Sequence, residues 1–394
     1  MFSRFLRLAV AGLPGFVLPV TAAPYLPASD AQVLERLPIA PADPVFRELR
    51  TLRAELAARP DNPRLAARLA GRYFDLAMAE GDPRYVGYAE AALRPWLSAA
   101  AIPPDLLVIR GQLRQYRHDF PGALADFATA LGADASNIDA RAWRVAIFMV
   151  QARYPEARAE CAALEAHASE LFFTGCISYV DATTGKTRAA YEKLSAALQK
   201  SPQASAASKL WNLTRLAEMA HRLGDPAKAE RHFRDALSLG ITDNFLLAAF
   251  ADFLLDEKRP AQVVALLRDR TRSDTLLLRL ALAENAQKLP TAANRVKALA
   301  DRFAEAGLRG DQLHLQEEAR FKLYLNQDPA GALKLASENW RTQREPRDAG
   351  ILLSAALAAR NRPAGQPAID WLEQSGFEDA RLRRDADALK ALAK

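Results

Sequence analysis

The chain has 394 residues, of which half are hydrophobic and a quarter are charged, and its formal net charge is +6. This balance excludes both an intrinsically disordered chain and a multispan membrane protein. The length allows two or three globular domains or one extended array of repeats, and the wealth of alanine and leucine favours helices over strands.

The first 22 residues have the three parts of a secretory signal peptide. Arg4 and Arg7 give a basic start, residues 8–20 form an apolar stretch of thirteen, and Ala22 supplies a small residue at the expected cleavage site. An uncleaved anchor is the alternative, but an apolar stretch interrupted by Pro14 is shorter than the ~20 residues that span a bilayer. We therefore expect cleavage after Ala22, a periplasmic or secreted protein, and no stable membrane insertion of the mature chain.

Charged residues of both signs are mixed along the rest of the chain, as in RLGDPAKAERHFRDAL over residues 222–237. Removing the two arginines of the signal changes the net charge from +6 to +4. Binding of nucleic acid would favour a clustered basic stripe with interleaved aromatic side chains. No such stripe is present in the sequence, so we expect no nucleic-acid partner.

Residues 23–44 are rich in proline and predict an extended N-terminal arm, because proline interrupts helices. From residue 45 to about 375 the pattern changes to amphipathic helices separated by short turns. A small residue followed by a large one four positions later and a small one three positions after that recurs at intervals of 34, 34, 33, 39, 34 and 69 residues. These copies begin at Ala89, Ala123, Ala157, Ala190, Ala229, Val263 and Ala332.

This unit resembles the tetratricopeptide repeat, a helix-turn-helix motif of 34 residues with small residues at its eighth, twentieth and twenty-seventh positions. The copies depart from the motif, since they lack its tryptophan and keep its late proline only at Pro60 and Pro202. The resemblance implies an all-α fold, a right-handed α-solenoid of stacked repeats. Two copies fill the small positions with Gly111, Ala123 and Ala130, and with Ala217, Ala229 and Ala236.

The first helices of the repeats are expected to line the concave groove of the solenoid, where such repeats bind a protein or an extended peptide. Their polar side chains are mixed in charge, and each could also be an ordinary solvated position. Helix 314–324 would add His314, Glu317, Phe321 and Tyr324. The candidate partner-binding residues are Gln112, Gln115, Tyr116, Glu218, His221, Arg222, Asp252 and Asp256.

The tripeptide Gly185-Lys186-Thr187 is the end of a phosphate-binding loop motif. The motif also needs a glycine five residues earlier, where this chain has Val180, and a strand before it. The surrounding sequence instead predicts two helices of one repeat. We therefore interpret Gly185 as the turn residue that ends the first helix and Thr187 as the cap of the second.

Cys161 and Cys176 are the two cysteines of the chain. An even number of cysteines in an exported protein favours a disulfide, while two buried, unpaired cysteines in the core are the alternative. A bridge between them would close a short loop between the second helix of one repeat and the first helix of the next.

No catalytic, cofactor or metal motif stands out. The sequence has no H-E-x-x-H and no G-x-S-x-G, and its paired acids fall on exposed helix faces. The best metal candidate, His314 with Glu317 and Glu318, has the composition of a solvated helix face. We expect no cofactor and no enzymatic activity.

Residues 376–394 predict a helix that caps the last repeat, with Leu382, Leu389 and Leu392 on one stripe; a membrane-surface helix is the weaker alternative. Taken whole, the chain is similar to secreted tetratricopeptide proteins of Gram-negative bacteria, which implies a non-catalytic scaffold for protein–protein interaction in the envelope. The alternatives are an envelope enzyme or enzyme subunit in cell-wall or polysaccharide metabolism, and a cytosolic regulator if the signal peptide is false.

Overall fold

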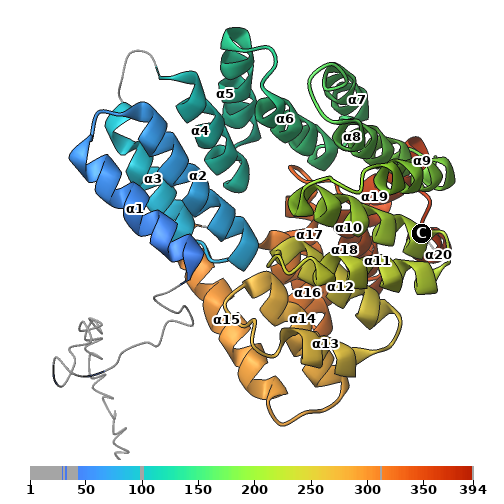
Figure 1. Ribbon diagram of the computed structural model, residues 1–394. Coiled ribbons are helices and arrows are strands. Elements are labelled where there is room, and N and C mark those ends of the chain that lie inside the picture. Colours follow the sequence, from blue (N-terminus) through green and yellow to red (C-terminus); the bar gives the residue numbers. More distant parts are fainter. Residues whose placement is uncertain (1–28, 30–31, 33–42, 98–101, 311–312, 393–394) are drawn as a thin grey trace, which may run out of the picture. The chain divides into compact units, whose positions relative to one another are not determined.

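The computed structural model describes residues 29, 32, 43–97, 102–310 and 313–392. The expected signal peptide lies outside these residues, as does nearly all of the proline-rich arm. The described residues contain helices and no strands, which confirms the expected all-α class (Figure 1). The helices are α1 (Pro44–Ala58), α2 (Pro63–Glu80), α3 (Arg84–Leu97), α4 (Pro104–Tyr116), α5 (Phe120–Ala133), α6 (Ile138–Val150), α7 (Tyr154–Ala163), α8 (Glu170–Thr183), α9 (Thr187–Lys200), α10 (Ala206–Arg222), α11 (Pro226–Ser238), α12 (Asn244–Asp256), α13 (Pro260–Leu267), α14 (Asp274–Ala286), α15 (Ala292–Leu308), α16 (Leu315–Tyr324), α17 (Pro329–Asn339), α18 (Pro346–Ala358), α19 (Arg362–Ser375) and α20 (Ala380–Lys390).

The described residues fall into two compact units, of which the first ends at Glu48 and the second begins at Leu49. Within the second unit, α2 to α19 follow one another as helix-turn-helix pairs in which the two helices pack together. Each pair also packs on the next pair, as the repeat prediction requires. None of the helices in the described part of the chain combines the length and the hydropathy needed to cross a membrane.

The repeat positions identified in the sequence are the contact points between helices. All seven leading residues lie in the second helix of a pair and are at most 2 % exposed. At the eighth-position glycine of one copy, Gly111, an added Cβ atom would lie 2.6 Å from the ring of Phe127. The small residues are therefore required because the neighbouring helix or ring occupies the space of a larger side chain.

The turn inside each pair places one residue in the left-handed region, with φ between 51° and 81°. This region is favourable for glycine and costs other residues about 1–2 kcal/mol. Only three of these nine turns, among the described residues, use glycine for it. The turn residues are Gly81, His118, Ala152, Gly185, Gly224, Lys258, Lys288, Gln327 and Arg360.

We predict that Lys288→Gly stabilises the protein by about 0.5–1 kcal/mol, because glycine relieves the left-handed strain at a φ of 53°. Lys288 is exposed, so little packing is lost. The matched control is Lys297→Gly inside α15, which should destabilise by about 1 kcal/mol. Thermal unfolding of the two variants measures both effects, and a loss of stability in Lys288→Gly would contradict the strain argument.

Three contacts join the C-terminal helices to the middle of the second unit. The Val150 carbonyl accepts a hydrogen bond of 2.7 Å from the Arg344 amide. The Tyr154 hydroxyl accepts one of 2.8 Å from the Trp371 indole, and Ala152 packs against the core around α18 and α19. Residues about 200 positions apart therefore meet, and the C-terminal helices lie against the pair α6–α7.

Helix α20 packs on α18 and α19. Its buried stripe is formed by Leu382, which is 1 % exposed, and by Leu389, which is fully buried. Added Cβ atoms at Gly350 and Gly365 would contact these two leucines, so both glycines allow the close approach. The helix therefore packs closely on the last pair, and its role as a cap stays a prediction.

Candidate functional site

A pocket of about 570 Å³ lies where α8, α10 and α12, the first helices of three consecutive pairs, face the segment that runs from the start of α18 to α20. Its wall therefore combines residues of the middle repeats with residues of the C-terminal end. The lining residues are Tyr179, Thr183, Arg215, Glu218, Met219, His221, Arg222, Gly224, Phe233, Ala249, Asp252, Phe253, Asp256, Glu257, Lys258, Glu345, Pro346, Arg347, Phe377, Asp379, Ala380, Arg381 and Arg384.

The pocket is lined by buried apolar side chains, which we call its floor, and by exposed charged side chains, which we call its rim. Buried side chains include those of Met219, Phe253 and Phe377. Exposed charged side chains include those of Asp256 and Arg384, which stand at its edge. This combination of an apolar interior and a few charged groups is typical of sites that bind a ligand or an anchor side chain of a partner.

Two arginines of the pocket stack on the same aromatic ring. The guanidinium of Arg215 lies 4.7 Å from the ring centre of Phe245, and that of Arg347 lies 4.9 Å from it. Arg215 also lies 4.2 Å from the ring centre of Tyr179 and forms an ion pair of 2.8 Å with Glu218. Burial raises the pKa of Tyr179 to about 12, so its hydroxyl stays protonated at neutral pH.

A third arginine connects the middle repeats with the C-terminal loop. Arg222 donates a hydrogen bond of 2.9 Å to the carbonyl of Ala182 and places its guanidinium 4.4 Å from the ring centre of Phe377. Burial lowers the pKa of Arg222, against the opposing effect of Glu218 and Asp379. The positive charge of Arg222 is therefore poorly solvated. It is stabilised by stacking on Phe377 and by the electrostatic attraction of carboxylates that form no hydrogen bond with it.

Asp252 of α12 holds together the first helices of three consecutive pairs. Its carboxylate accepts hydrogen bonds of 2.6 Å from Arg279 of α14 and 3.0 Å from Arg320 of α16. Burial acts to raise the pKa of Asp252, but the two guanidiniums outweigh it and hold the pKa well below its usual range. Both carboxylate oxygens are engaged, so Asp252 is a structural ion-pair centre at the edge of the pocket.

His221 and Glu257 form the one histidine–carboxylate pair among the described residues. The two side chains are 3.5 Å apart, and the His221 ring packs edge-on against Phe253 at 5.0 Å between centres. Both line the pocket. The arrangement can move a proton in principle, but no serine, cysteine or lysine nucleophile lines the described pocket beside it except Lys258.

Five of the eight candidate partner-binding residues line this pocket: Glu218, His221, Arg222, Asp252 and Asp256. The other three lie on α4, away from it, and Gln112 among them is buried at 9 % exposure. Phe321 was expected in the groove but packs in the core, with its ring centre 5.4 Å from that of Phe303. Phe321 lies on the side of α16 that faces the core. The expectation that it lines the groove is therefore wrong.

The residues that sequence reasoning missed come mainly from the C-terminal end: Arg347, Phe377 and Arg381. The repeat pattern identifies which side of a helix is exposed within its own pair. It carries no information on which later helix returns to cover that side. The signal that was available is Phe377, an aromatic residue set among charges in FEDARLRR and buried at 2 % exposure.

The Gly185-Lys186-Thr187 tripeptide forms the turn between α8 and α9. Gly185 has a φ of 81°, which confirms its expected role as the turn residue. Thr187 was expected to cap α9, but it is the first residue of that helix, and its hydroxyl bonds to the Ala182 carbonyl. The cap comes from Glu378, whose carboxylate accepts a 2.8 Å hydrogen bond from the Thr187 amide and occupies the place that a phosphate would need.

We predict that Glu378→Ala destabilises the protein by about 1 kcal/mol, because the amide of Thr187 loses a charged cap. The hydrogen bonds from Thr187 and the charge of Arg222 lower the pKa of Glu378 despite its burial, so the cap is ionised at neutral pH. The matched control is Glu192→Ala, an exposed position on α9, which should change stability by less than about 0.5 kcal/mol. Denaturant unfolding measures both, and equal effects would contradict the capping role.

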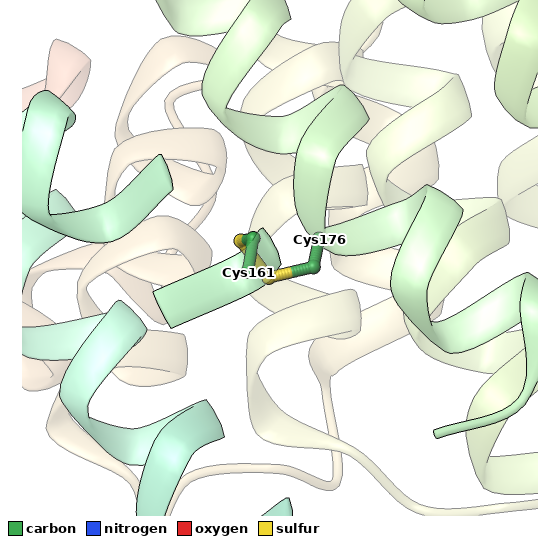
Figure 2. The surroundings of a disulfide bond; sticks show 2 residues. All are labelled: Cys161 and Cys176. Carbon is green, nitrogen blue, oxygen red and sulfur yellow. A yellow bond between two sulfur atoms is a disulfide. The ribbon is translucent and has the colours of Figure 1, made fainter. Parts of the chain in front are cut away.

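Cys161 of α7 and Cys176 of α8 are joined by a disulfide, with their Cα atoms 5.6 Å apart (Figure 2). Both residues are buried in the core shared by the two helices. The bridge ties together the two pairs that carry Tyr154 and Gly185, at which the C-terminal segment makes its contacts. Within the described residues, no three His, Cys, Asp or Glu side chains are grouped so that they could hold a metal ion.

No protein-family model matches the chain, and no curated protein matches it. Among solved structures, the chain is similar to one in the APC/C hetero-tetramer Cut9-Hcn1, with 12 % identity and a TM-score of 0.49. That alignment covers 82 % of this chain and 62 % of the other, so the chain spans less than two thirds of that protein's length.

Two further solved structures are similar. Yeast Tom70 has 12 % identity and a TM-score of 0.41, over 88 % of this chain and 84 % of the other. A human IFIT1 dimer with m7Gppp-AAAA has 15 % identity and a TM-score of 0.40, over 88 % and 86 %. Likeness at this level carries no functional information, so the tetratricopeptide-like character of the helix pairs stands on their own geometry. The right-handed turn of the solenoid stays a prediction.

Proposed function

We propose that the protein is a non-catalytic interaction scaffold that is exported to the bacterial envelope and holds a partner at the pocket between α8, α10, α12 and the C-terminal segment. The observation that carries the proposal is the pocket itself, with its apolar floor and charged rim. Interfaces of this kind anchor one or a few side chains of a partner in a desolvated centre surrounded by polar contacts. Because the helix pairs stack on one another, the pocket is present without a partner.

Site-specific crosslinking tests this scaffold function. A photoreactive residue at Arg384, on the rim, should capture an envelope protein in living cells, while the same residue at Lys297 of α15 should not. The two positions are matched, because their side chains are 74 % and 76 % exposed. Mass spectrometry of the adducts identifies the partner. Equal capture at both positions, or none at Arg384, would remove the support for the pocket as the docking site.

Export is supported by the sequence of residues 1–22 and by the disulfide, which persists in oxidising compartments. The protein, produced from its full-length gene with a C-terminal tag, should lack the first 22 residues when isolated and should appear in the periplasmic or extracellular fraction. Intact-mass measurement and fractionation test this. A full-length chain with two free thiols in the cytosol would overturn the proposed location.

An envelope enzyme is the second candidate function, and one observation favours it: His221 lies 3.5 Å from Glu257 in a pocket that also holds arginines and a phenol. A carboxylate beside an imidazole can orient it as a general base. The variant His221→Gln separates the two functions. A scaffold should lose its cellular role in this variant only together with its crosslinks, whereas an enzyme that uses His221 should lose its role and keep the crosslinks.

A further inference from the structure

We propose that the pocket binds a single carboxylate group carried on an apolar body, held by arginines that lack a carboxylate partner of their own. This inference rests on the proposed function, because the same pocket is the docking site, and it names the chemistry that the site recognises. The carboxylate can belong to a free organic acid or to the end of a partner's polypeptide chain. The experiment below separates these two sources.

Unused hydrogen-bond donors are the first argument. The side chain of Arg347 has no hydrogen bond and no ion pair within the described chain; its contact is the stacking on Phe245. Arg222 uses one of its five N–H groups, on the Ala182 carbonyl, and contacts no carboxylate. A guanidinium presents five donors in a planar fork that matches a carboxylate in a bidentate way. These two side chains therefore offer donors that the protein itself does not use.

Three of the six carboxylates that line the pocket are engaged by hydrogen bonds. Glu218 accepts from Arg215, Asp252 accepts from two arginines, and the carboxylate of Asp379 caps α20 by accepting from the amides of Arg381 and Leu382. Asp256 is exposed at the rim and interacts electrostatically with Arg381. Asp256, Glu257 and Glu345 carry the remaining carboxylates of the wall, and none of them bonds to Arg222 or Arg347. A ligand that pairs with the unused donors of these two arginines must therefore be an acceptor.

The carboxylates around Arg347 favour a ligand with one negative charge over a ligand with two. Burial lowers the pKa of Arg347, but the nearby carboxylates outweigh that effect and raise it; they belong to Glu345, Glu218, Asp252 and Asp348. These carboxylates are too far away to bond to the guanidinium, yet they already balance part of its charge. A monoanionic carboxylate is compatible with this setting, while a dianionic phosphate would be repelled by the acidic residues of the wall.

The buried apolar residues of the floor determine which apolar group the ligand can carry. Phe253 is 3 % exposed, Phe377 is 2 % exposed and Met219 is 1 % exposed, and all three line the pocket. A volume of about 570 Å³ lies in the range of small-molecule sites. The C-terminal segment closes one side, so a polypeptide can enter with one side chain or one terminus. An aromatic body about the size of phenylalanine is the simplest match to the phenylalanines of the floor.

Titration calorimetry with the intact, disulfide-bonded protein tests the proposal with matched probes. N-acetyl-phenylalanine should bind, its carboxamide should bind at least about tenfold more weakly, and inorganic phosphate should not bind. Arg347→Gln should weaken binding of the acid at least about tenfold and leave the weak binding of the amide unchanged. Arg231→Gln, at an exposed arginine of α11 outside the pocket, is the control and should leave both unchanged.

The outcomes separate the possibilities. Equal binding of the acid and the amide, or acid binding that survives in a folded Arg347→Gln, would overturn the carboxylate proposal. Arg347→Lys, which keeps the charge and loses the fork, should give an intermediate affinity and provides a second variant if the first does not fold. If N-acetyl-phenylalanine competes with the crosslink at Arg384, the carboxylate comes from the partner's chain; binding without competition assigns it to a free acid. A crosslinked partner with no carboxylate binding would leave the scaffold function standing and refute this inference alone.

Discussion

Asp252→Asn is expected to destabilise the protein by about 3–5 kcal/mol, the usual cost of removing one member of a buried ion pair. The side chain of Arg279 is fully buried against Asp252, and Arg320, which is 17 % exposed, contacts the other carboxylate oxygen. An amide in place of the carboxylate leaves two guanidiniums without the carboxylate to which they bond. The loss should appear in denaturant unfolding as a lower midpoint.

The control is Asp235→Asn on α11, an exposed position, where we expect a change of less than about 0.5 kcal/mol. The pH dependence gives a second check. Because the pKa of Asp252 is lowered in the folded state, its contribution is fully present above the unfolded pKa of about 4 and is lost as the pH falls below it. The difference between wild type and Asp252→Asn should therefore be constant at neutral pH and shrink in acid. A difference that grows in acid would show that the ion pair is not the cause.

The sequence predicted that Asp252 lies in the groove and binds a partner, but its ion pairs indicate a structural role. Asp252 does line the pocket, but its charge joins α12 to α14 and α16. The periodic pattern assigns a residue to an exposed side of its own helix. It cannot show that arginines from the next two first helices converge on that residue, because the convergence depends on the rotation between successive pairs.

The repeat itself was predictable because its physical cause is local. Ala89 and Ala123 recur at the repeat spacing since each lies where a neighbouring helix approaches most closely, and both are fully buried. A period, a small residue and a short turn are enough to predict helix pairs and their order. The same local logic explains the confirmed role of Gly185 at a turn.

Two other features were not predictable, for different reasons. Six of the nine turn residues adopt left-handed φ values without being glycine, as Ala152 and Lys258 do, so composition gave no sign of the common turn geometry. The capping of Thr187 by Glu378 joins residues 191 positions apart, and a local pattern cannot contain it. The C-terminal segment supplies 8 of the 23 residues that line the pocket, and a prediction that treats the repeats one at a time misses them.

Reducing the disulfide between Cys161 and Cys176 is expected to cost about 3 kcal/mol, the chain-entropy value for a loop of about 15 residues. The effect should be local, because the stability of a repeat array is the sum of its units and their interfaces. Hydrogen exchange should therefore quicken in α7 and α8 and their immediate neighbours, and stay unchanged in α14 and α15. Comparing the same chain with and without reductant avoids the cavity that a Cys161→Ala variant would add.

The reduced protein should nevertheless keep the C-terminal segment in place. A cross-link of this kind acts mainly on the unfolded chain, so the native hydrogen bond from Trp371 to Tyr154 does not depend on it. Tryptophan fluorescence of the folded state should be the same with and without reductant, while the unfolding midpoint falls. If the fluorescence changed before unfolding, the disulfide would be holding α7 in position for the C-terminal helices. The bond would then support the pocket itself and not only the stability of the chain.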